Sequence, residues 1–430
     1  MPGSFRPDLA ALLALGRPGE WPVAFTANGT LTWNGFQQKI AARTTQWQTG
    51  SPRRLLMVEA DPGEFAATLL AALACGHTPV IPPNFRPDTL ADMEARLADD
   101  RMPLLNGIEL YTSGSSGTPK RIAKCLDQLE AECRALESLW GKDLDGAAIA
   151  ATVPHHHIYG LLFRLLWPLL AGRPFDIVTC AEPTTLAERL TVLGDCALIA
   201  SPAQLARLPE LVDLNSLAPR PRRVFSSGGP LAATVAAAFH AAWGAAPTEV
   251  FGSTETGGIA WRHQENGNES WTPLPSVQIG IGDDCALQVS SLFLPDPTPW
   301  RMDDAAELLP DGRFRLAGRL DRTVKIEEKR LALPEMEARL AAHPWVETAA
   351  VVPLVGERRI LVGALIVPSN AGQAALAADR RGVGITLRRH LAAWYDPVLL
   401  PRRWRFTETL PYDERGKLPR AALTALFATP

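Results

Sequence analysis

The feature that most constrains the fold is an alternation of short apolar runs with helical patterns between residues 54 and 251. Residues 54–60 (RLLMVEA) are typical of a buried strand, residues 63–75 of an apolar helix, and residues 77–81 of the next strand. Further strand-like runs lie at residues 148–153, 175–180, 197–201, 223–226 and 248–251, and residues 232–243 carry the clearest helical pattern. Strands that alternate with helices indicate a mainly parallel sheet with covered faces. The sequence therefore predicts a large N-terminal α/β domain.

The pattern changes after about residue 277. Runs at residues 277–281, 286–290 and 313–317 are separated by tight turns, which favours an antiparallel subdomain. Beyond residues 318–321 we predict a small α+β domain. Its expected elements are a β-ribbon at 323–331, helices at 334–342 and 386–395, a loop with a marginal helix at 369–379, and strands at 348–353, 359–367 and 404–407. The predicted domains are therefore residues 1–319 and residues 320–430.

Composition and net charge are those of an ordinary globular protein and argue against a general nucleic-acid binder. A hydrophobic content of 47% with 21% charged residues is ordinary for a globular protein, and the net charge of −3 argues against a general nucleic-acid binder. The charge is unevenly distributed, because residues 320–430 contain 17 Lys and Arg against 12 Asp and Glu. This basic region could receive an acidic partner, although a surplus of arginines is also typical of a solvated face.

The cysteines and the apolar segments bear on location. The six cysteines form no CxxC pair and have no metal-ligand spacing, which fits a reduced, cytoplasmic protein. The N-terminal 21 residues lack a basic start and a small-residue cleavage site, so we expect a surface helix rather than a signal peptide. The apolar run at residues 161–170 is interrupted by Arg164 and Pro168 and is too short to cross a bilayer, so no membrane span is predicted.

Residues 111–121 (YTSGSSGTPKR) combine hydroxyls with glycines and end in two cations. Gly114, Gly117 and Pro119 disfavour a helix or strand, but backbone N–H groups and hydroxyls can wrap around an anion, with Lys120 as a point charge. By itself, a run of Ser and Gly is more often a flexible surface linker. The segment is not a Walker loop, because Lys120 follows proline and no Ser or Thr comes after it.

Five further segments distinguish between an anion loop and a linker. They are residues 154–160 (PHHHIYG), 226–231 (SSGGPL), 251–257 (FGSTETG), 318–326 (GRLDRTVKI, preceded by the acidic pair at 303–304) and 410–420 (LPYDERGKLPR). Two of them, residues 226–231 and 251–257, follow predicted strands. The carboxyl edge of a parallel sheet is where the ligands of α/β proteins bind, so an aromatic ring, hydroxyls and a carboxylate there favour a ligand site.

In this order, the segments resemble the adenylate-forming superfamily of acyl- and aryl-CoA synthetases, luciferases and adenylation domains of peptide synthetases. The motifs TSGSSGTPK, GSTE, GRxDxxVKI and LPxxxxGKxxR are jointly very specific, and the resemblance runs from about residue 54 to residue 420. It implies an acid–thiol ligase that uses ATP and Mg²⁺. Such an enzyme converts a carboxylic acid into an acyl-adenylate, releases pyrophosphate and rotates its small domain so that a thiol can attack.

The resemblance implies which residues bind ATP. The loop that holds the β- and γ-phosphates comprises Thr112, Ser113, Ser115, Ser116, Thr118 and Lys120. Gly228, Gly229 and Pro230 line one face of the adenine, and Phe251 replaces the usual tyrosine on the other face. Asp304 accepts hydrogen bonds from the ribose hydroxyls, helped by Arg319.

The resemblance also implies the catalytic and pocket residues. Thr254 hydrogen-bonds phosphate, Glu255 binds Mg²⁺, Asp321 is the hinge, and Lys417 is the lysine needed for adenylation. The substrate pocket is lined by His157, Gly252, Ser253 and Gly257. Residues 154–162 contain no carboxylate to pair with an α-ammonium, and the pocket segments mix aromatic, small and apolar side chains. These features favour an aryl or acyl acid over an amino acid.

Several simpler interpretations stay open. Taken alone, Glu255 is more often an exposed carboxylate, and Lys417 a solvated tail residue. The histidines at positions 155–157 could hold a metal, although no acidic or cysteine partner stands nearby in the sequence. Each of these readings treats the residue apart from the ordered set of motifs.

The chain resembles most closely the compact, stand-alone ligases that load aryl or acyl starters onto carrier proteins in pigment and polyene pathways. The expected thiol acceptor is therefore the phosphopantetheine of an acyl carrier protein, or coenzyme A. Glu328 stands where relatives have a glycine that lets the backbone approach the pantetheine arm. This departure supports one alternative, an adenylyltransferase without a thiolation step. A second alternative is a non-catalytic nucleotide-binding module.

Overall fold

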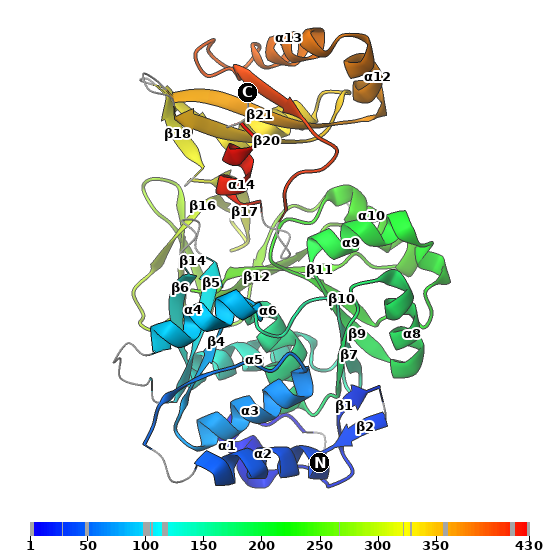
Figure 1. The fold of residues 1–430 in the computed structure, drawn as a ribbon, viewed down its shortest axis with the longest axis vertical. Coiled ribbons are helices and arrows are strands. Elements are labelled where there is room, and N and C mark those ends of the chain that lie inside the picture. Colours follow the sequence, from blue (N-terminus) through cyan, green and yellow to red (C-terminus); the bar gives the residue numbers. More distant parts are fainter. Residues whose placement is uncertain are drawn as a thin grey trace. The chain divides into compact units, whose positions relative to one another are not determined.

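The structure is a computed structural model of the chain. It describes residues 4–27, 29–47, 51–97, 104, 106–113, 119–265, 267–320, 322–326, 329–355, 360–412 and 418–427 (Figure 1). The chain forms two compact units. One contains Met1–Ile279 and Val289–Trp300, and the other contains Gly280–Gln288 and Arg301–Pro430. Compact units do not identify a hinge, so the predicted domain boundary between residues 319 and 320 stays a prediction.

A nine-stranded sheet with the order β13-β12-β11-β10-β9-β7-β8-β1-β2 forms the centre of the first unit. Its parallel strands are β1 (Pro22–Thr26), β8 (Phe175–Thr179), β7 (Ala148–Ala151), β9 (Cys196–Ala200), β10 (Arg223–Ser226) and β11 (Thr248–Ser253). Antiparallel strands close both edges: β2 (Gly29–Thr32) on one side, and β12 (Gly257–His263) and β13 (Thr272–Pro273) on the other. The predicted mainly parallel α/β sheet is therefore confirmed.

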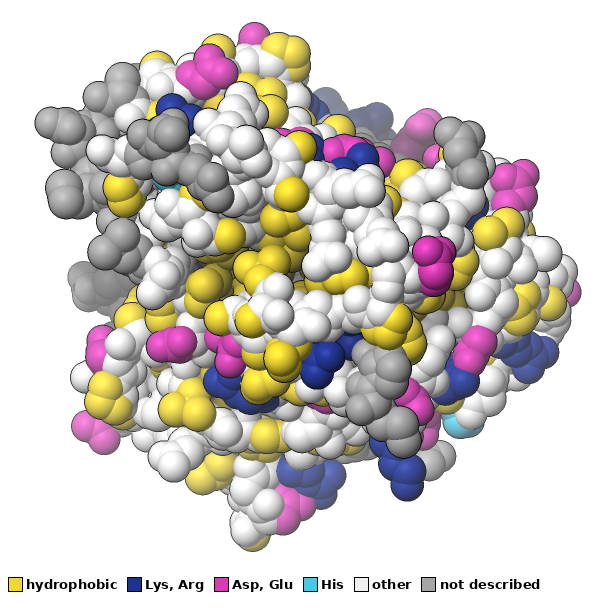
Figure 2. Space-filling model, turned by 90° about the horizontal axis from the view of Figure 1, so that it is seen from below, with side chains coloured by type: hydrophobic (Ala, Val, Ile, Leu, Met, Phe, Trp, Pro, Cys, Tyr) yellow, Lys and Arg dark blue, Asp and Glu magenta, His cyan; other side chains and the backbone are white. Residues whose placement is uncertain are grey.

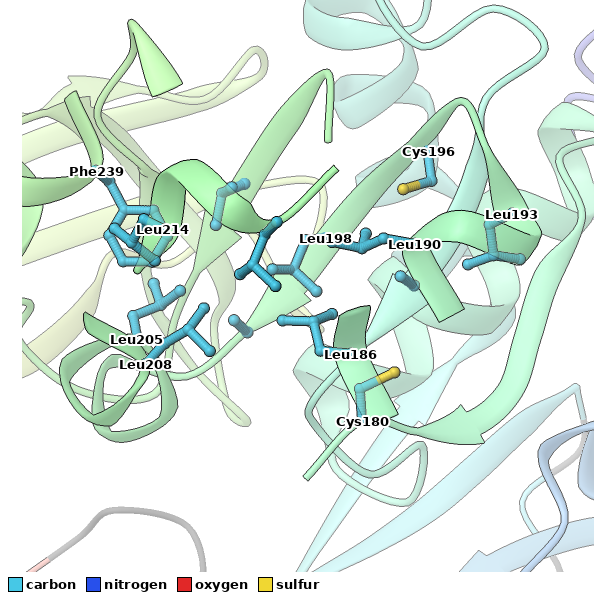
Figure 3. Close-up of a cluster of buried hydrophobic side chains, with 14 of the residues drawn as sticks. Cys180, Leu186, Leu190, Leu193, Cys196, Leu198, Leu205, Leu208, Leu214 and Phe239 are labelled. Carbon is cyan, nitrogen blue, oxygen red and sulfur yellow. The ribbon is translucent and has the colours of Figure 1, made fainter. Parts of the chain in front are cut away.

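Helices α8 (Pro183–Leu193), α9 (Pro202–Leu211) and α10 (Ala233–Trp243) cover one face of this sheet. Figure 3 shows leucine side chains of α8 and α9 gathered near Leu198 of β9, with Phe239 of α10 at one end of the cluster. Pro183 and Pro202 each stand in the first turn of their helix, where a missing N–H costs no hydrogen bond. The buried leucines recur at helical spacing, so this core follows directly from the sequence pattern.

The other face is covered by α5 (Leu126–Trp140) and by a helical segment with three parts. These are α6 (Ile158–Gly160), a π-helical turn (Leu161–Leu166) and α7 (Trp167–Ala171). Trp140 and Phe163 pack their rings against Phe225 of β10, with ring centroids 5.0 and 5.2 Å apart. The buried Arg164 donates to the backbone carbonyls of β8 residues, which explains how a charge is tolerated in this apolar run.

A second sheet has the order β3-β4-β5-β6. Strands β3 (Arg54–Leu56), β4 (Thr78–Ile81) and β5 (Gly107–Ser113) are parallel, whereas β6 (Pro119–Cys125) returns antiparallel to β5. Helices α3 (Pro62–Ala74) and α4 (Pro87–Leu97) contact this sheet, α2 (Trp33–Trp47) packs against α3, and α1 (Leu9–Leu15) contacts α5 through the hydrogen bond from the Leu9 N–H to Glu130. The βαβ unit predicted for residues 54–81 is present, but its first strand ends at Leu56. From below, hydrophobic side chains gather near the middle of the visible face, with charged side chains scattered around them (Figure 2).

The antiparallel subdomain is a sheet with the order β14-β15-β16-β17. Its strands are β14 (Val277–Ile281), β15 (Ala286–Ser291), β16 (Trp300–Leu308) and β17 (Phe314–Arg319). The sequence pattern indicated three of these strands and missed β16. Among the described residues, no helix is long and apolar enough to cross a membrane.

The C-terminal α+β region contains a ribbon of β18 (Thr323–Ile326) and β19 (Lys329–Ala332), and a three-stranded sheet. The sheet consists of β20 (Val346–Val355), β21 (Ile360–Pro368) and β22 (Arg403–Phe406), with α11 (Leu333–Ala341), α12 (Asn370–Ala378), α13 (Arg380–Leu391) and α14 (Arg420–Ala425). The marginal helix expected within residues 369–379 is a full helix, α12, because Ser369 caps its N-terminus. The helix predicted at 386–395 begins six residues earlier, at Arg380, where Asp379 provides the cap.

Candidate active site

Three segments that the sequence singled out, residues 154–160, 226–231 and 251–257, lie at one edge of the nine-stranded sheet. Strands β7, β9, β10 and β11 are parallel neighbours, so their carboxyl ends lie side by side. His157, Ser201 and Gly228 follow β7, β9 and β10, respectively, and Phe251 lies within β11, near its end. The topology therefore brings the histidine turn, the glycine turn and the aromatic residue to a single edge, as expected for a ligand site of an α/β protein.

The predicted phosphate loop is the connection of a β-hairpin. Thr112 and Ser113 end β5, and they pair with Lys120 and Pro119 of β6. Ser115, Ser116 and Thr118 lie outside the described residues. The expectation that Gly114, Gly117 and Pro119 preclude regular structure was wrong for the flanking residues, because regular β pairing extends to Ser113 and resumes at Pro119. The hairpin fixes where the loop begins and ends.

An ion pair joins this hairpin to the segment that carries Glu255. The Lys120 ammonium lies 2.6 Å from a carboxylate oxygen of Glu255, although the two residues are 135 positions apart in the sequence. Burial alone would raise the pKa of Glu255, but the hydrogen bond from Lys120, a backbone hydrogen bond, the Lys120 charge and a hydrogen bond from Ser253 together outweigh burial, so the pKa of Glu255 is lowered. Glu255 is therefore an anion that a cation already faces, not an isolated exposed carboxylate.

Glu255 lies in a tight turn between β11 and β12. Ser253 and Thr256 close the turn: each backbone N–H donates to the other's hydroxyl oxygen at 3.1 Å. Gly252 sits at a bulge, where an added Cβ would lie 2.2 Å from the carbonyl oxygen of Gly257. Gly257 has a φ of +72°, which favours glycine. The two glycines and the two hydroxyls thus fix the turn, and the half-buried Thr254 and Glu255 lie within it.

Two buried charged side chains contact this turn from inside the protein. Lys124 of β6 is 2% exposed and donates to the carbonyl oxygens of Glu255 at 2.6 Å and Phe293 at 2.9 Å. Glu132 of α5 is 3% exposed and accepts the N–H of Gly258 at 2.7 Å. Burial raises the pKa of Glu132 to about 7 and lowers the pKa of Lys124. Sequence reasoning missed both residues, because β6 and α5 each carry several charged side chains and nothing in the pattern marks these two as buried.

The expected adenine-binding residues lie on neighbouring strands. Gly228, Gly229 and Pro230 follow β10 and are exposed, and Gly228 has a φ of +93° with open space where a Cβ would stand. Phe251 is half-buried near the end of β11, and its ring centroid lies 5.5 Å from that of Trp271. The segment after β10 therefore offers exposed main chain without side chains at Gly228 and Gly229, and the neighbouring strand β11 offers the aromatic ring of Phe251.

The histidine turn follows β7. His155 is buried, its Nε2–H donates to the carbonyl of Glu59, and its ring packs 4.5 Å from that of Phe65. Burial lowers the pKa of His155 to about 3, so this ring is neutral at physiological pH. His157 is half-buried and forms the N-cap position of α6. Within the described parts of the chain, no three His, Cys, Asp or Glu side chains are grouped to hold a metal.

Asp304 and Arg319 are directly opposite each other on β16 and β17. Arg319 donates to the Asp304 carboxylate at 3.4 Å, and the Asp304 side chain is 9% exposed. The pairing is consistent with an arginine that orients the carboxylate. Asp321, Glu328 and Lys417 lie outside the described residues, so their predicted roles stay predictions.

Comparisons with known proteins bear on the family. Residues 108–289 match the family of AMP-binding enzymes. A 4-coumarate–CoA ligase of Rhodobacter capsulatus is 32% identical over 311 residues, which cover 71% of this chain and 73% of that protein. A 4-coumarate–CoA ligase of Halorhodospira halophila is 28% identical over 331 residues, which cover 76% and 79%.

Solved structures of low identity share the fold. ATP-bound MatB from Rhodopseudomonas palustris has a TM-score of 0.77 at 17% identity, and the alignment covers 99% of each chain. The amide bond synthetase McbA from Marinactinospora thermotolerans has a TM-score of 0.76 at 20% identity, with 95% of this chain and 98% of that chain covered. The 32% identity to the 4-coumarate–CoA ligase, together with the AMP-binding match, confirms the predicted family: the chain belongs to the AMP-binding, adenylate-forming acid–CoA ligases.

Proposed function

We propose that this protein activates an aryl carboxylic acid, with arylpropenoic acids such as 4-coumarate as first candidates. The acid attacks the α-phosphorus of ATP, and the resulting acyl-adenylate is passed to the thiol of coenzyme A or of an acyl carrier protein. The observation that carries the proposal is the Lys120–Glu255 ion pair, which joins strand β6, at the end of the predicted phosphate loop, to the turn that follows β11. The choice of acid rests on the names of the 4-coumarate–CoA ligases that the chain resembles.

The reaction requires two anions to meet, because a carboxylate must approach a polyphosphate. Positive charge and aligned donors are therefore needed where negative charge accumulates. Lys120 is 59% exposed, so its ammonium can leave Glu255 and contact the phosphates when ATP binds. Thr254, Thr112 and Ser113, and the loop hydroxyls of Ser115, Ser116 and Thr118, are the proposed phosphate donors.

The residues present fit a magnesium ion carried by the nucleotide. Glu255 is a single, partly exposed carboxylate in the same turn as the Thr254 hydroxyl. Mg²⁺ prefers oxygen ligands and usually takes one or two carboxylates together with waters and substrate phosphates, so it does not need a dedicated cluster of protein ligands. When bound, Mg²⁺ supplies positive charge to the phosphates. Glu255 is the residue that would hold it.

The remaining roles belong to the adenosine and to the small domain. We propose that Phe251 stacks on the adenine opposite Gly228, Gly229 and Pro230, and that Asp304 binds the ribose with the help of Arg319. Lys417 would complete the adenylation site, and Asp321 would be the hinge about which residues 320–430 turn. The two half-reactions need different groups at the same place, which is the physical reason for a hinge.

The proposed acid pocket begins at the turn that His157 starts and includes Gly252, Ser253 and Gly257. Behind this turn, the π-helical segment carries Phe163, whose ring packs against Phe225 and lies in a cluster with Trp140 and Trp167. These rings are fully buried and support the turn from within the core, so the choice of an aryl acid rests on the names of the relatives and not on these rings.

Acid-dependent exchange of labelled pyrophosphate into ATP tests the proposal. We expect exchange with 4-coumarate, cinnamate or benzoate, and weaker exchange with hexanoate and octanoate. If none of these acids supports exchange, the proposal is wrong. Adding coenzyme A or a phosphopantetheinylated carrier protein then identifies the acceptor by mass spectrometry. If exchange is robust but neither thiol is acylated, the alternative of an adenylyltransferase is correct.

We also propose a cytoplasmic location. All six cysteines are free thiols. Cys133 and Cys196 are fully buried, and burial raises the pKa of both thiols. Free thiols suit a reducing compartment. Alkylation of intact cells with an impermeant reagent, followed by mass spectrometry, would detect labelled Cys285, the exposed thiol, if this location were wrong.

A further inference from the structure

The Glu255 turn is engaged by two charged side chains that the roles above do not use. Lys124 reaches the turn from β6 and donates to the carbonyl oxygen of Glu255, and Glu132 reaches it from α5 and accepts the N–H of Gly258. One contact lies within the turn, at Glu255, and the other lies just after it, at Gly258 of β12. Together they fix the main chain at the point where Glu255 projects.

Lys120 and Lys124 both donate hydrogen bonds to Glu255, but to different parts of it. Side chains four positions apart on a strand point to the same face, so both lysines project from one face of β6. Lys120 holds the Glu255 carboxylate at 2.6 Å and is largely exposed, whereas Lys124 holds the Glu255 carbonyl at 2.6 Å and is buried. Lys120 is free to exchange its partner for a phosphate, and Lys124 is not.

Glu132 packs directly against the turn. An added Cβ at Gly257 would lie 2.3 Å from one Glu132 carboxylate oxygen, and one at Gly258 would lie 3.0 Å from the other. The carboxylate therefore fills the space beneath both glycines. Packed apolar residues of similar volume often stabilise a core as well as buried charges do, so stability alone does not account for a lysine and a glutamate here.

We propose that Lys124 and Glu132 are positioning residues that hold the Glu255 turn so that the Glu255 carboxylate faces the metal-bound phosphates of ATP. This inference rests on the proposed function. Lys124 acts on the main chain of Glu255, and Glu132 acts on the strand that returns from the turn. Residues that orient a metal ligand typically change metal affinity about 10–100-fold when they are replaced.

The test compares two variants with a matched control. Lys124→Met removes the ammonium, and Glu132→Gln keeps the shape of the side chain but removes its charge. Glu130→Gln is the control, because Glu130 lies on the same helix, is 7% exposed, and also accepts one backbone N–H, that of Leu9, away from the turn. ATP binding to each full-length protein is measured by calorimetry with Mg²⁺ and with EDTA. Hydrogen–deuterium exchange of peptides that span the turn is measured without nucleotide.

We expect the tightening of ATP binding by Mg²⁺ to fall about 10–100-fold in Lys124→Met and about tenfold in Glu132→Gln. Affinity in EDTA should stay within about twofold, and the turn should exchange faster in both variants. Glu130→Gln should match the unmodified protein in each measurement. If Lys124→Met does not fold, the comparison of Glu132→Gln with Glu130→Gln decides.

The inference is overturned if Glu132→Gln keeps the full effect of Mg²⁺, or if Glu130→Gln loses as much of it. Either result would mean that the buried charges only stabilise the fold. If the unmodified protein does not bind ATP with Mg²⁺ at all, the proposed function fails, and the inference fails with it. Failure of the proposed function is seen in the unmodified protein, whereas failure of the positioning inference is seen only in the variants, so the two outcomes are distinguishable.

Discussion

Lys120→Met should separate the stability of this protein from its activity. The Lys120 side chain is 59% exposed and that of Glu255 is 25% exposed. Solvent screens such a pair, so its loss should lower the free energy of unfolding by less than about 1 kcal/mol. For a chain of this length, that corresponds to a change in Tm of no more than about 2 °C. The fold should therefore tolerate the substitution.

The effect on adenylation should be much larger. Removing a cation or donor that faces charge developing in a transition state typically costs about 10²–10³-fold in rate, or about 3–4 kcal/mol. Pyrophosphate exchange and thermal unfolding should be measured on the same preparation, with Lys142→Met as the control, because Lys142 is exposed and lies outside the proposed site. A fall in Tm of 10 °C, or exchange within threefold of the unmodified protein, would refute this reasoning.

Three further predictions concern single side chains. Burial lowers the pKa of His155 from 6.5 in the unfolded chain to about 3 in the folded protein. As the pH falls below 6.5, the unfolded state therefore binds a proton that the folded state does not bind. The free energy of unfolding should fall by about 2 kcal/mol between about pH 8 and pH 5. His155→Gln should remove that part of the pH dependence in urea titrations, and an unchanged slope would contradict it. Asp304→Asn should raise KM for ATP about tenfold with little change in kcat; an equal fall in kcat would argue against ribose binding. Glu109→Gln should lower the free energy of unfolding by about 3 kcal/mol, because Glu109 is fully buried between Arg54 and Arg121, each 2.8 Å away; urea unfolding checks this, and a loss below 1 kcal/mol would be inconsistent with it.

The sequence predicted the architecture of the parallel sheet because buried strands and helices have different spacings. The runs at residues 197–201 and 223–226 became neighbouring strands β9 and β10, and the leucines of α8 and α9 cover them. The segments that bear Gly228 and Phe251 could be placed at one edge, since parallel strands end on the same side. Their location followed from topology without any knowledge of contacts.

Other features depended on contacts that a local pattern does not contain. Pro119 looks like a breaker, but it pairs with Ser113 in a hairpin whose register is set by seven cross-strand pairs. Lys124 and Glu132 are polar residues in otherwise ordinary elements, and they find their partners 131 and 126 positions away. A sequence window cannot reveal a partner at such a distance, so the internal support of the Glu255 turn could only be found in the structure.

The central claim is that the protein converts a carboxylic acid into an acyl-adenylate. Transfer of a carboxylate oxygen to AMP tests this claim most directly. If the acid attacks the α-phosphorus, its oxygen bridges the acyl group and the phosphate, and it stays on the phosphate when a thiol displaces AMP. With 4-coumarate or another accepted acid labelled with ¹⁸O in the carboxylate, the account predicts AMP that carries one ¹⁸O atom. Unlabelled AMP, or ADP and phosphate as the products, would contradict it.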